Sequence, residues 1–264
     1  MPPRPSPPRL THFLCIPLIT PHSRSQLQSS LNKFRTDVTS DRSPENPDGI
    51  PERAIRPIGT LHLTLGVMSL LSQERVDNAL KLLRSLNLKE LLSDQKSGPG
   101  ESGKDTASRA LGDDGEIKKK IQEETTLKGL KVTLRGLTSM HTPSKTSILY
   151  AGPVDEDHSL QSFCQKLRDS FSEAELFVPD TRPLLLHATI VNTIYVPGVK
   201  GKGSGHGKNR AKLTIDARDI LEKYEEFEWM SDVKVEKVTI CKMGAKKLED
   251  GDEEYEVEGE VDMP

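Results

Sequence analysis

The sequence predicts an α+β fold with two related lobes, and three observations support this class. Short apolar segments of strand character alternate with segments whose apolar residues recur every three or four positions. The predicted order is two strand-then-helix units, then strands, a helix and a strand-helix-strand-strand series, which mixes hairpin-like and crossover connections. One short polar pattern occurs on two of the apolar strands, once in each half of the 264 residues. This length suits one large domain or two small lobes that share a cleft.

The first half of the chain is predicted to form two strand-then-helix units. Residues 11–18 are apolar and predict a buried strand, and helical spacing follows at Leu27, Leu31, Phe34 and Val38. Residues 40–57 contain five turn-forming Pro and Gly residues and predict a loop without periodicity. Residues 61–67 then alternate like a strand. The hydroxyl of Ser72 can cap a second helix, whose apolar stripe consists of Val76, Ala79, Leu80, Leu83 and Leu86.

The second half is predicted to contain five strands, at 131–137, 146–151, 184–191, 233–243 and 255–261. Between the second and third of these, Asp157 or Ser159 can cap a helix. Its apolar stripe consists of Leu160, Phe163, Cys164, Leu167 and Phe171. A further helix is predicted after Asp216. No period of 20 to 50 residues is present, which excludes a solenoid.

Three polar segments are predicted to lie outside the folded core. Residues 1–9 form a Pro-rich leader, residues 94–126 a polar and charged insertion, and residues 198–212 a loop rich in Gly, Lys and Arg. Hydrophobic residues make up 34% of the chain and aromatic residues 4%, which is low for a compact globule of this length. We therefore expect a disordered leader, one domain over 10–264, a disordered insertion and a flexible basic loop.

Cysteine usage and hydropathy argue against several classes of protein. The three cysteines are far apart and odd in number, which predicts neither a disulfide framework nor a zinc site, and fits a reducing intracellular compartment. The apolar run at 13–19 is short, is broken by Pro17 and has no small-residue cleavage site after it, so a strand explains it better than a signal peptide. No run approaches the ~20 apolar residues of a spanning helix.

The charge is unevenly distributed along the chain. Nine acids and no Lys or Arg lie in 249–262, and without them the formal net charge of −3 becomes +6. The body of the protein is therefore mildly basic. That charge is compatible with a phosphate-bearing substrate, although mildly basic proteins are common.

Two His-x-Thr motifs are the candidate catalytic residues. Successive side chains of a strand alternate between its faces, so His62 and Thr64 project together, and so do His187 and Thr189. If the two strands converge, one neutral imidazole can remove a proton from an attacking hydroxyl or water while the other protonates the leaving oxygen. The Thr hydroxyls can donate to the non-bridging oxygens of a phosphodiester, where negative charge grows.

A structural role for these residues is the alternative, because one chance His-x-Thr match is expected among seven histidines. Five histidines lack the pattern, whereas the two that have it lie in Leu-flanked apolar strands in separate halves of the chain. This distribution favours the catalytic interpretation. No spacing places two histidine ligands together for a metal, and no Gly-x-Ser-x-Gly elbow is present for a serine nucleophile.

The motifs HLTL at 62–65 and HATI at 187–190 resemble the two-histidine (2H) phosphoesterase superfamily. The stretch IRPIGTLHLTLGVMSL, followed by an amphipathic helix, is similar to one branch of it. That branch holds the A-kinase anchoring protein gamma/delta central domain and the activating signal cointegrator complex subunit with a KH domain. The resemblance implies a bilobal, pseudo-twofold duplicated 2′,5′ RNA ligase-like fold, with a cleft between two mostly antiparallel sheets. It also implies a metal-independent phosphodiesterase acting on 2′,5′-linked oligonucleotides, 2′,3′-cyclic phosphates or RNA ends.

Two other functions stay open at this stage. One is a non-catalytic nucleic-acid-binding or scaffold subunit of a transcription-coactivator or DNA-repair complex, and the other is RNA end ligation by the same chemistry in reverse. We expect a monomeric catalytic domain in the nucleus or cytoplasm, without cofactor, metal or membrane partner. Tyr195, Lys200 and Lys202 are the candidate substrate-binding residues, although rim packing for the tyrosine and solvation for the lysines are simpler explanations.

Overall fold

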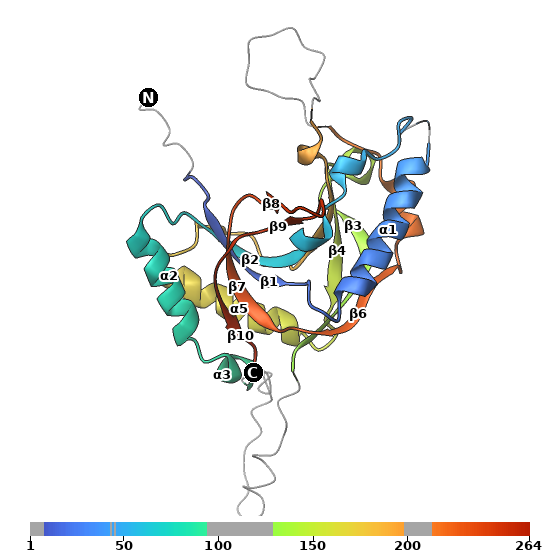
Figure 1. The fold of residues 1–264 in the computed structure, drawn as a ribbon. Coiled ribbons are helices and arrows are strands. Elements are labelled where there is room, and N and C mark those ends of the chain that lie inside the picture. The colour runs from blue at the N-terminus through green and yellow to red at the C-terminus, as the bar shows by residue number, and fades with distance from the viewer. Residues whose placement is uncertain (1–7, 43, 45, 94–128, 198–212) are drawn as a thin grey trace, which may run out of the picture.

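The computed structural model describes residues 8–42, 44, 46–93, 129–197 and 213–264. Two four-stranded antiparallel sheets form its centre (Figure 1). The first sheet has the order β10-β7-β1-β2, with bounds Val257–Asp262, Lys237–Lys242, His12–Pro17 and His62–Met68. The second has the order β5-β4-β3-β6, with bounds Ala188–Asn192, Ile148–Val154, Lys131–Ser139 and Glu228–Lys234. The predicted α+β class with two antiparallel sheets is confirmed.

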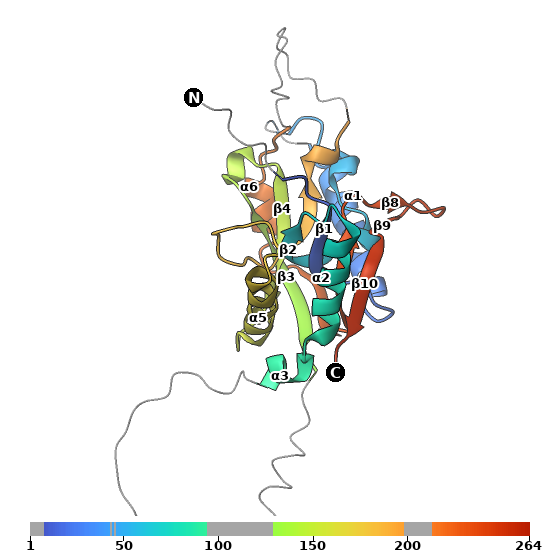
Figure 2. The same cartoon turned by 90° about the vertical axis from the view of Figure 1, so that its left-hand side faces the viewer.

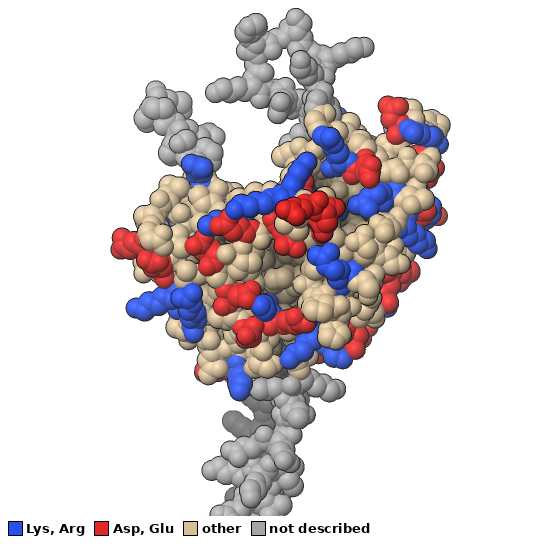
Figure 3. Space-filling view, viewed as in Figure 1, with Lys and Arg blue, Asp and Glu red and all other residues tan. Residues whose placement is uncertain are grey.

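The helices described are α1, α2, α3, α5 and α6, with bounds Arg24–Ser40, Gln73–Ser85, Leu88–Ser93, Ser159–Glu173 and Arg218–Lys223. Short 3-10 turns η1, η2, η4 and η5 occupy Glu52–Ala54, Ile58–Thr60, Pro143–Lys145 and Thr193–Tyr195. A small hairpin pairs β8 (Lys246–Lys247) with β9 (Glu253–Glu254) and lies against η2. Figure 3 shows acidic side chains gathered over this hairpin.

The two sheets repeat one arrangement. In the first, strand β1 is followed by helix α1 and then by β2, which pairs antiparallel with β1 at the sheet edge. In the second, β4 is followed by α5 and then by β5, which pairs antiparallel with β4 at the sheet edge. Each His-x-Thr motif therefore lies at the edge strand of its own sheet, as expected from a duplicated unit.

Helix packing joins the two halves into one unit. Helix α1, which follows a strand of the first sheet, packs against β6 of the second, whereas α5 lies against β2 of the first. Figure 2 shows α1 and α5 on opposite sides of the molecule with strands between them. Buried side chains from both sheets and all these helices belong to one continuous apolar core. The lobes therefore share a core and do not form two separable domains.

An aromatic cluster anchors α1 to the second sheet. Phe34 of α1 contacts the rings of Tyr224 and Trp229 with centroids 5.0 and 5.3 Å apart. The indole nitrogen of Trp229 donates to the carbonyl of Gly136 at 2.8 Å, and the hydroxyl of Tyr224 donates to the carboxylate of Asp37 at 2.7 Å. Both buried polar groups are thus satisfied, which removes the cost of burying them unpaired.

Two predicted strands differ from the structure. The run at 233–243 was predicted as one strand, but it contains the end of β6 and all of β7, which belong to different sheets and are separated at Val235 and Glu236. The run at 184–191 was predicted as one strand, but β5 begins only at Ala188. The recurring apolar residues of 233–243 cannot show where the chain changes sheets, because both sheets offer a buried environment.

One predicted helix cap was wrong in part. Asp157 does accept a hydrogen bond from the amide of Ser159, but the amides of Leu160 and Gln161 donate to the carboxylate of Asp155 at 3.0 and 2.7 Å. The residue directly before the helix, His158, has a positive φ of 55° and makes no side-chain cap bond. The cap at Ser72 is confirmed, since its hydroxyl accepts from the amide of Arg75.

The predicted insertion at 94–126, the basic loop at 198–212 and most of the leader at 1–9 lie outside the described residues. Within the described part of the chain, no helix has both the length and the apolar character needed to cross a membrane. All three cysteines are free and buried.

Candidate active site

Strand alternation places each His-x-Thr pair on one face of its strand. Leu61, Leu63 and Leu65 point into the core and are at most 2% exposed, whereas His62 and Thr64 between them are half-buried. The second motif follows the same rule: Ala188 and Ile190 are fully buried, and His187 and Thr189 are half-buried. His187 lies one residue before β5, and Thr189 is paired with Tyr150 of β4.

The two edge strands that carry the motifs are neighbours in space, since β2 contacts β5. A single segment connects them. Ile55 forms a β-bridge with Val191, and the amide of Arg56 donates to the carbonyl of Ile190 at 2.8 Å. The chain then passes through η2 directly into His62. The segment before the first motif is thus hydrogen-bonded to the strand that carries the second motif.

Both imidazoles are held in the same way. Nδ1 of His62 lies 2.7 Å from the carbonyl oxygen of Thr60, and Nδ1 of His187 lies 2.9 Å from that of Leu185. A carbonyl oxygen only accepts, so Nδ1 carries the proton and donates in each ring. This bond fixes the tautomer and leaves Nε2 of each histidine available to exchange a proton with a substrate.

The environment of His62 favours its neutral form. Burial, which is the largest cause, and the charges of Arg56 and His187 together lower the pKa of His62 to about 4, against an opposing effect from the hydrogen bond to Thr60. The effect of His187 on this pKa indicates that the two rings share one electrostatic environment. At neutral pH His62 is therefore an unprotonated imidazole, which is the state a general base needs.

Aromatic rings surround both histidines. Phe13 and Tyr255 lie 4.8 and 5.3 Å from the ring of His62, and Tyr150 lies 5.3 Å from the ring of His187, measured between centroids. Phe13 also belongs to a small apolar cluster that is separate from the main core and includes Cys15, Cys241, Val67 and Tyr255. His62, Tyr255 and both of these cysteines line a cavity of about 330 Å³.

Of the three predicted substrate-binding residues, the structure describes one. Tyr195 lies in η5, three residues after the end of β5 at Asn192. Its ring is 46% exposed and lies against the guanidinium of Arg56, whose Cζ is 3.8 Å from the ring centroid. Lys200 and Lys202 lie outside the described residues.

Two residues near His62 were not predicted from the sequence. The ring of Tyr255 lies 5.3 Å from that of His62 and Tyr255 interacts with Arg56, and the charge of Arg56 acts on His62. Arg56 stands in a turn-rich stretch where exposed arginines are usual, and Tyr255 stands in the acidic segment. No local pattern marks either as part of a site.

A comparison with models of known protein families identifies the family of this chain. A family model described as the AKAP7 2′5′ RNA ligase-like domain matches residues 10–263. The chain belongs to this family. The match contains both His-x-Thr motifs, and the resemblance to 2H phosphoesterases stated from the sequence is confirmed.

Two curated proteins are similar in sequence to this chain. An uncharacterised protein of Schizosaccharomyces pombe is 31% identical over 131 residues, which is 49% of this chain and 55% of the relative. Activating signal cointegrator 1 complex subunit 1 of Mus musculus is 23% identical over 227 residues, which is 82% of this chain and 54% of the relative. The chain spans about half the length of the curated relatives it matches.

The solved structures that resemble this chain have low sequence identity to it. The crystal structure of E. coli LigT complexed with 3′-AMP aligns with 96% of this chain and 98% of its own, at 15% identity and a TM-score of 0.47.

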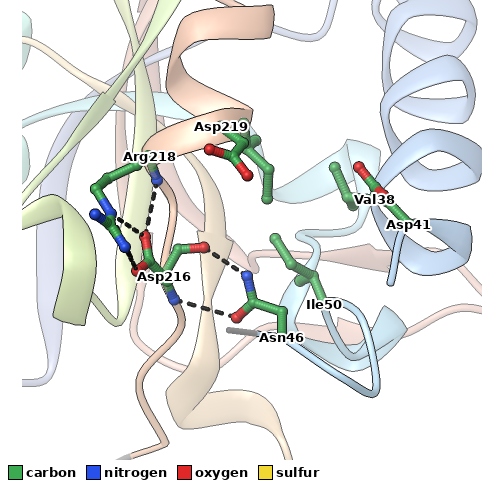
Figure 4. Close-up of a pocket in the computed structure, with 8 residues that line it drawn as sticks. Val38, Asp41, Asn46, Ile50, Asp216, Arg218 and Asp219 are labelled. Atoms are coloured by element: carbon green, nitrogen blue, oxygen red, sulfur yellow. Dashed lines mark hydrogen bonds and ion pairs between the residues drawn. The ribbon is translucent and has the colours of Figure 1, made fainter. Parts of the chain in front are cut away.

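A second cavity, of about 290 Å³, lies between the end of α1 and the start of α6 (Figure 4). Three of its polar residues are joined by hydrogen bonds. Arg218 contacts the carboxylate of Asp216, and the amide of Asn46 bonds to the backbone of Asp216 at 2.6 and 3.1 Å. Neither His-x-Thr motif lines this cavity, so it is not part of the candidate active site.

Within the described ranges, no group of three or more His, Cys, Asp or Glu side chains could hold a metal ion.

Proposed function

We propose that the protein is a metal-independent phosphodiesterase that acts on RNA-type substrates. The substrates we propose are 2′,5′-linked oligonucleotides, 2′,3′-cyclic phosphates or RNA 3′ ends. One observation carries the proposal: both histidines of the family motifs donate from Nδ1 to a backbone carbonyl and so keep Nε2 for proton transfer. Paired general acid and general base catalysis of this kind contributes typically ~10²–10⁴-fold for each group.

The environment of each residue suggests its role in hydrolysis of a cyclic phosphate. His62, neutral at pH 7, removes a proton from the attacking water. The water oxygen bonds to phosphorus, the bond from phosphorus to one ribose oxygen breaks, and His187 in its protonated form gives its proton to that leaving oxygen. Thr64 and Thr189, on the same faces as the histidines, donate to the non-bridging oxygens. With the general acid and general base roles exchanged, the same groups would catalyse the reverse reaction, ligation.

Alanine substitution of each histidine tests the proposal. The assay is a panel of 2′,5′- and 3′,5′-linked oligonucleotides and 2′,3′-cyclic phosphates in EDTA, with products identified by mass spectrometry. We expect His62→Ala and His187→Ala each to lower turnover by ~10²-fold or more. His141→Ala, which removes an exposed histidine, serves as the matched control. Turnover that survives both active-site substitutions in folded protein rules out the mechanism.

A binding subunit is the second candidate function, and the similarity to the mouse cointegrator subunit favours it. In that case the protein would bind RNA ends within a transcription-coactivator or repair complex in the nucleus or cytoplasm, without converting them. The same panel separates the two functions. If the protein retains an oligonucleotide but forms no product from any substrate of the panel, the result supports the binding subunit.

A further inference from the structure

Arg56 carries a buried charge without a carboxylate partner. The residue is 5% exposed, and none of the ion pairs formed among the described residues includes it. Its Nη2 atom is shielded from solvent and makes no hydrogen bond. Because removal of a guanidinium from water is costly unless its charge and its donors are satisfied, a buried arginine of this kind needs an anionic partner.

The neighbours of Arg56 orient it without neutralising it. The ring of Tyr195 covers one face of the guanidinium, with its centroid 3.8 Å from Cζ, and Tyr255 also interacts with the guanidinium. Burial raises the pKa of Tyr255 to about 12, so this tyrosine is uncharged at neutral pH. Both contacts are of the kind that hold a guanidinium plane in a fixed orientation.

Two neighbouring arginines are already paired. Arg56 and Tyr195 line a cavity of about 710 Å³ together with Arg24 and Arg35, and neither His-x-Thr motif lines it. Arg24 contacts Asp252 at 3.6 Å, and Arg35 contacts Glu52 at 3.7 Å. Arg56 is connected to the candidate active site through Tyr255, which interacts with Arg56 and whose ring lies 5.3 Å from that of His62.

We propose that Arg56 binds the phosphate oxygens of a nucleotide held at the two histidines, and that Tyr195 moves aside to admit it. This inference rests on the proposed function, because it assigns a residue to the same site. A planar guanidinium can donate two parallel hydrogen bonds to a phosphate, and the anion would satisfy both Nη2 and the charge. Since Nη2 has no contact with solvent, a side chain must move for an anion to reach it, and the exposed ring of Tyr195 covers it.

Binding measurements test this role independently of turnover. Isothermal titration calorimetry with 2′-AMP and 3′-AMP compares the parent protein with Arg56→Gln, Arg56→Lys and Arg42→Gln. Arg42 is an exposed arginine of the same turn-rich segment that does not line this cavity, so Arg42→Gln is the control for loss of one charge. We expect Arg56→Gln to weaken binding by ~10-fold or more, Arg56→Lys to weaken it less, and Arg42→Gln to leave it within about twofold.

A second measurement separates phosphate binding from a purely structural role. The charge of Arg56 lowers the pKa of His62, so Arg56→Gln should move the acid limb of the kcat/KM profile to higher pH, whereas Arg56→Lys should not. Unchanged nucleotide affinity in folded Arg56→Gln protein overturns the role of Arg56 and leaves the proposed function standing. A parent protein that binds neither nucleotide overturns the role of Arg56, and the turnover panel then decides the proposed function separately. Loss of binding in Arg56→Gln with an unmoved acid limb also overturns the assignment, because the guanidinium would then not act at His62.

Discussion

Acidification from pH 8 to pH 5 is expected to destabilise the folded protein. The reason is that His62 binds a proton in the unfolded chain over this range but not in the folded protein. Its pKa is about 4 in the folded state, whereas an unperturbed histidine titrates at about 6.5. Between these values the unfolded chain binds the proton and the folded protein does not, so stability falls as pH falls through this window. For one such group, linkage gives a loss of about 2 kcal/mol at pH 5 relative to pH 8, and a limit of about 3 kcal/mol well below pH 4.

Urea unfolding at pH 5 and pH 8, followed by circular dichroism, measures this loss. The comparison is between the parent protein and His62→Gln, which keeps a polar side chain that cannot titrate. The glutamine variant should lose about 2 kcal/mol less than the parent on acidification, because all other groups are common to both proteins. His22→Gln, on an exposed turn, is the control for removal of one imidazole. If the two proteins lose equal stability, His62 is not held neutral by its surroundings, and its assignment as the general base fails.

Two further predictions concern packing. A Cβ added at Gly66 would lie 2.5 Å from the ring of Phe177, which stacks on Phe171 in the core, so Gly66→Ala should lower the free energy of unfolding by about 1–3 kcal/mol in urea titration. Thiol titration with a disulfide reagent should find no reactive group in the native protein and three after unfolding in urea. Burial raises the pKa of Cys15 and of Cys164, and all three thiols are inaccessible. Rapid reaction of even one thiol in native protein would show that its strand or helix opens readily.

Local patterns in the sequence were sufficient for the parts of the site that repeat. The alternation around His62 and His187 placed each histidine and its threonine on one face, and the structure has the leucines and Ala188 between them buried. Helical stripes likewise predicted α1, α2 and α5 with the residues that are buried. These features depend on the period of a strand or a helix, which is set by neighbours a few residues apart.

Features that depend on contacts between distant residues were not predictable in the same way. The segment containing Val233 and Val238 predicted a single strand, because hydrophobicity shows that a residue is buried but not which sheet buries it. The burial of Arg56 depends on its hydrogen bond to Ile190 and on the ring of Tyr195. A turn-rich segment in isolation gives no indication of either contact.

The sequence by itself therefore determined the chemistry that is available, which is two imidazoles and two hydroxyls on strands with one face turned away from the core. The tertiary structure decided which tautomer each ring takes, how far the pKa of His62 falls and which cation is buried beside it. The physical reason is that side-chain periodicity is a property of neighbouring residues. Desolvation and charge instead depend on everything within a few ångströms in space, and here that includes residues from both sheets and from the loop between them.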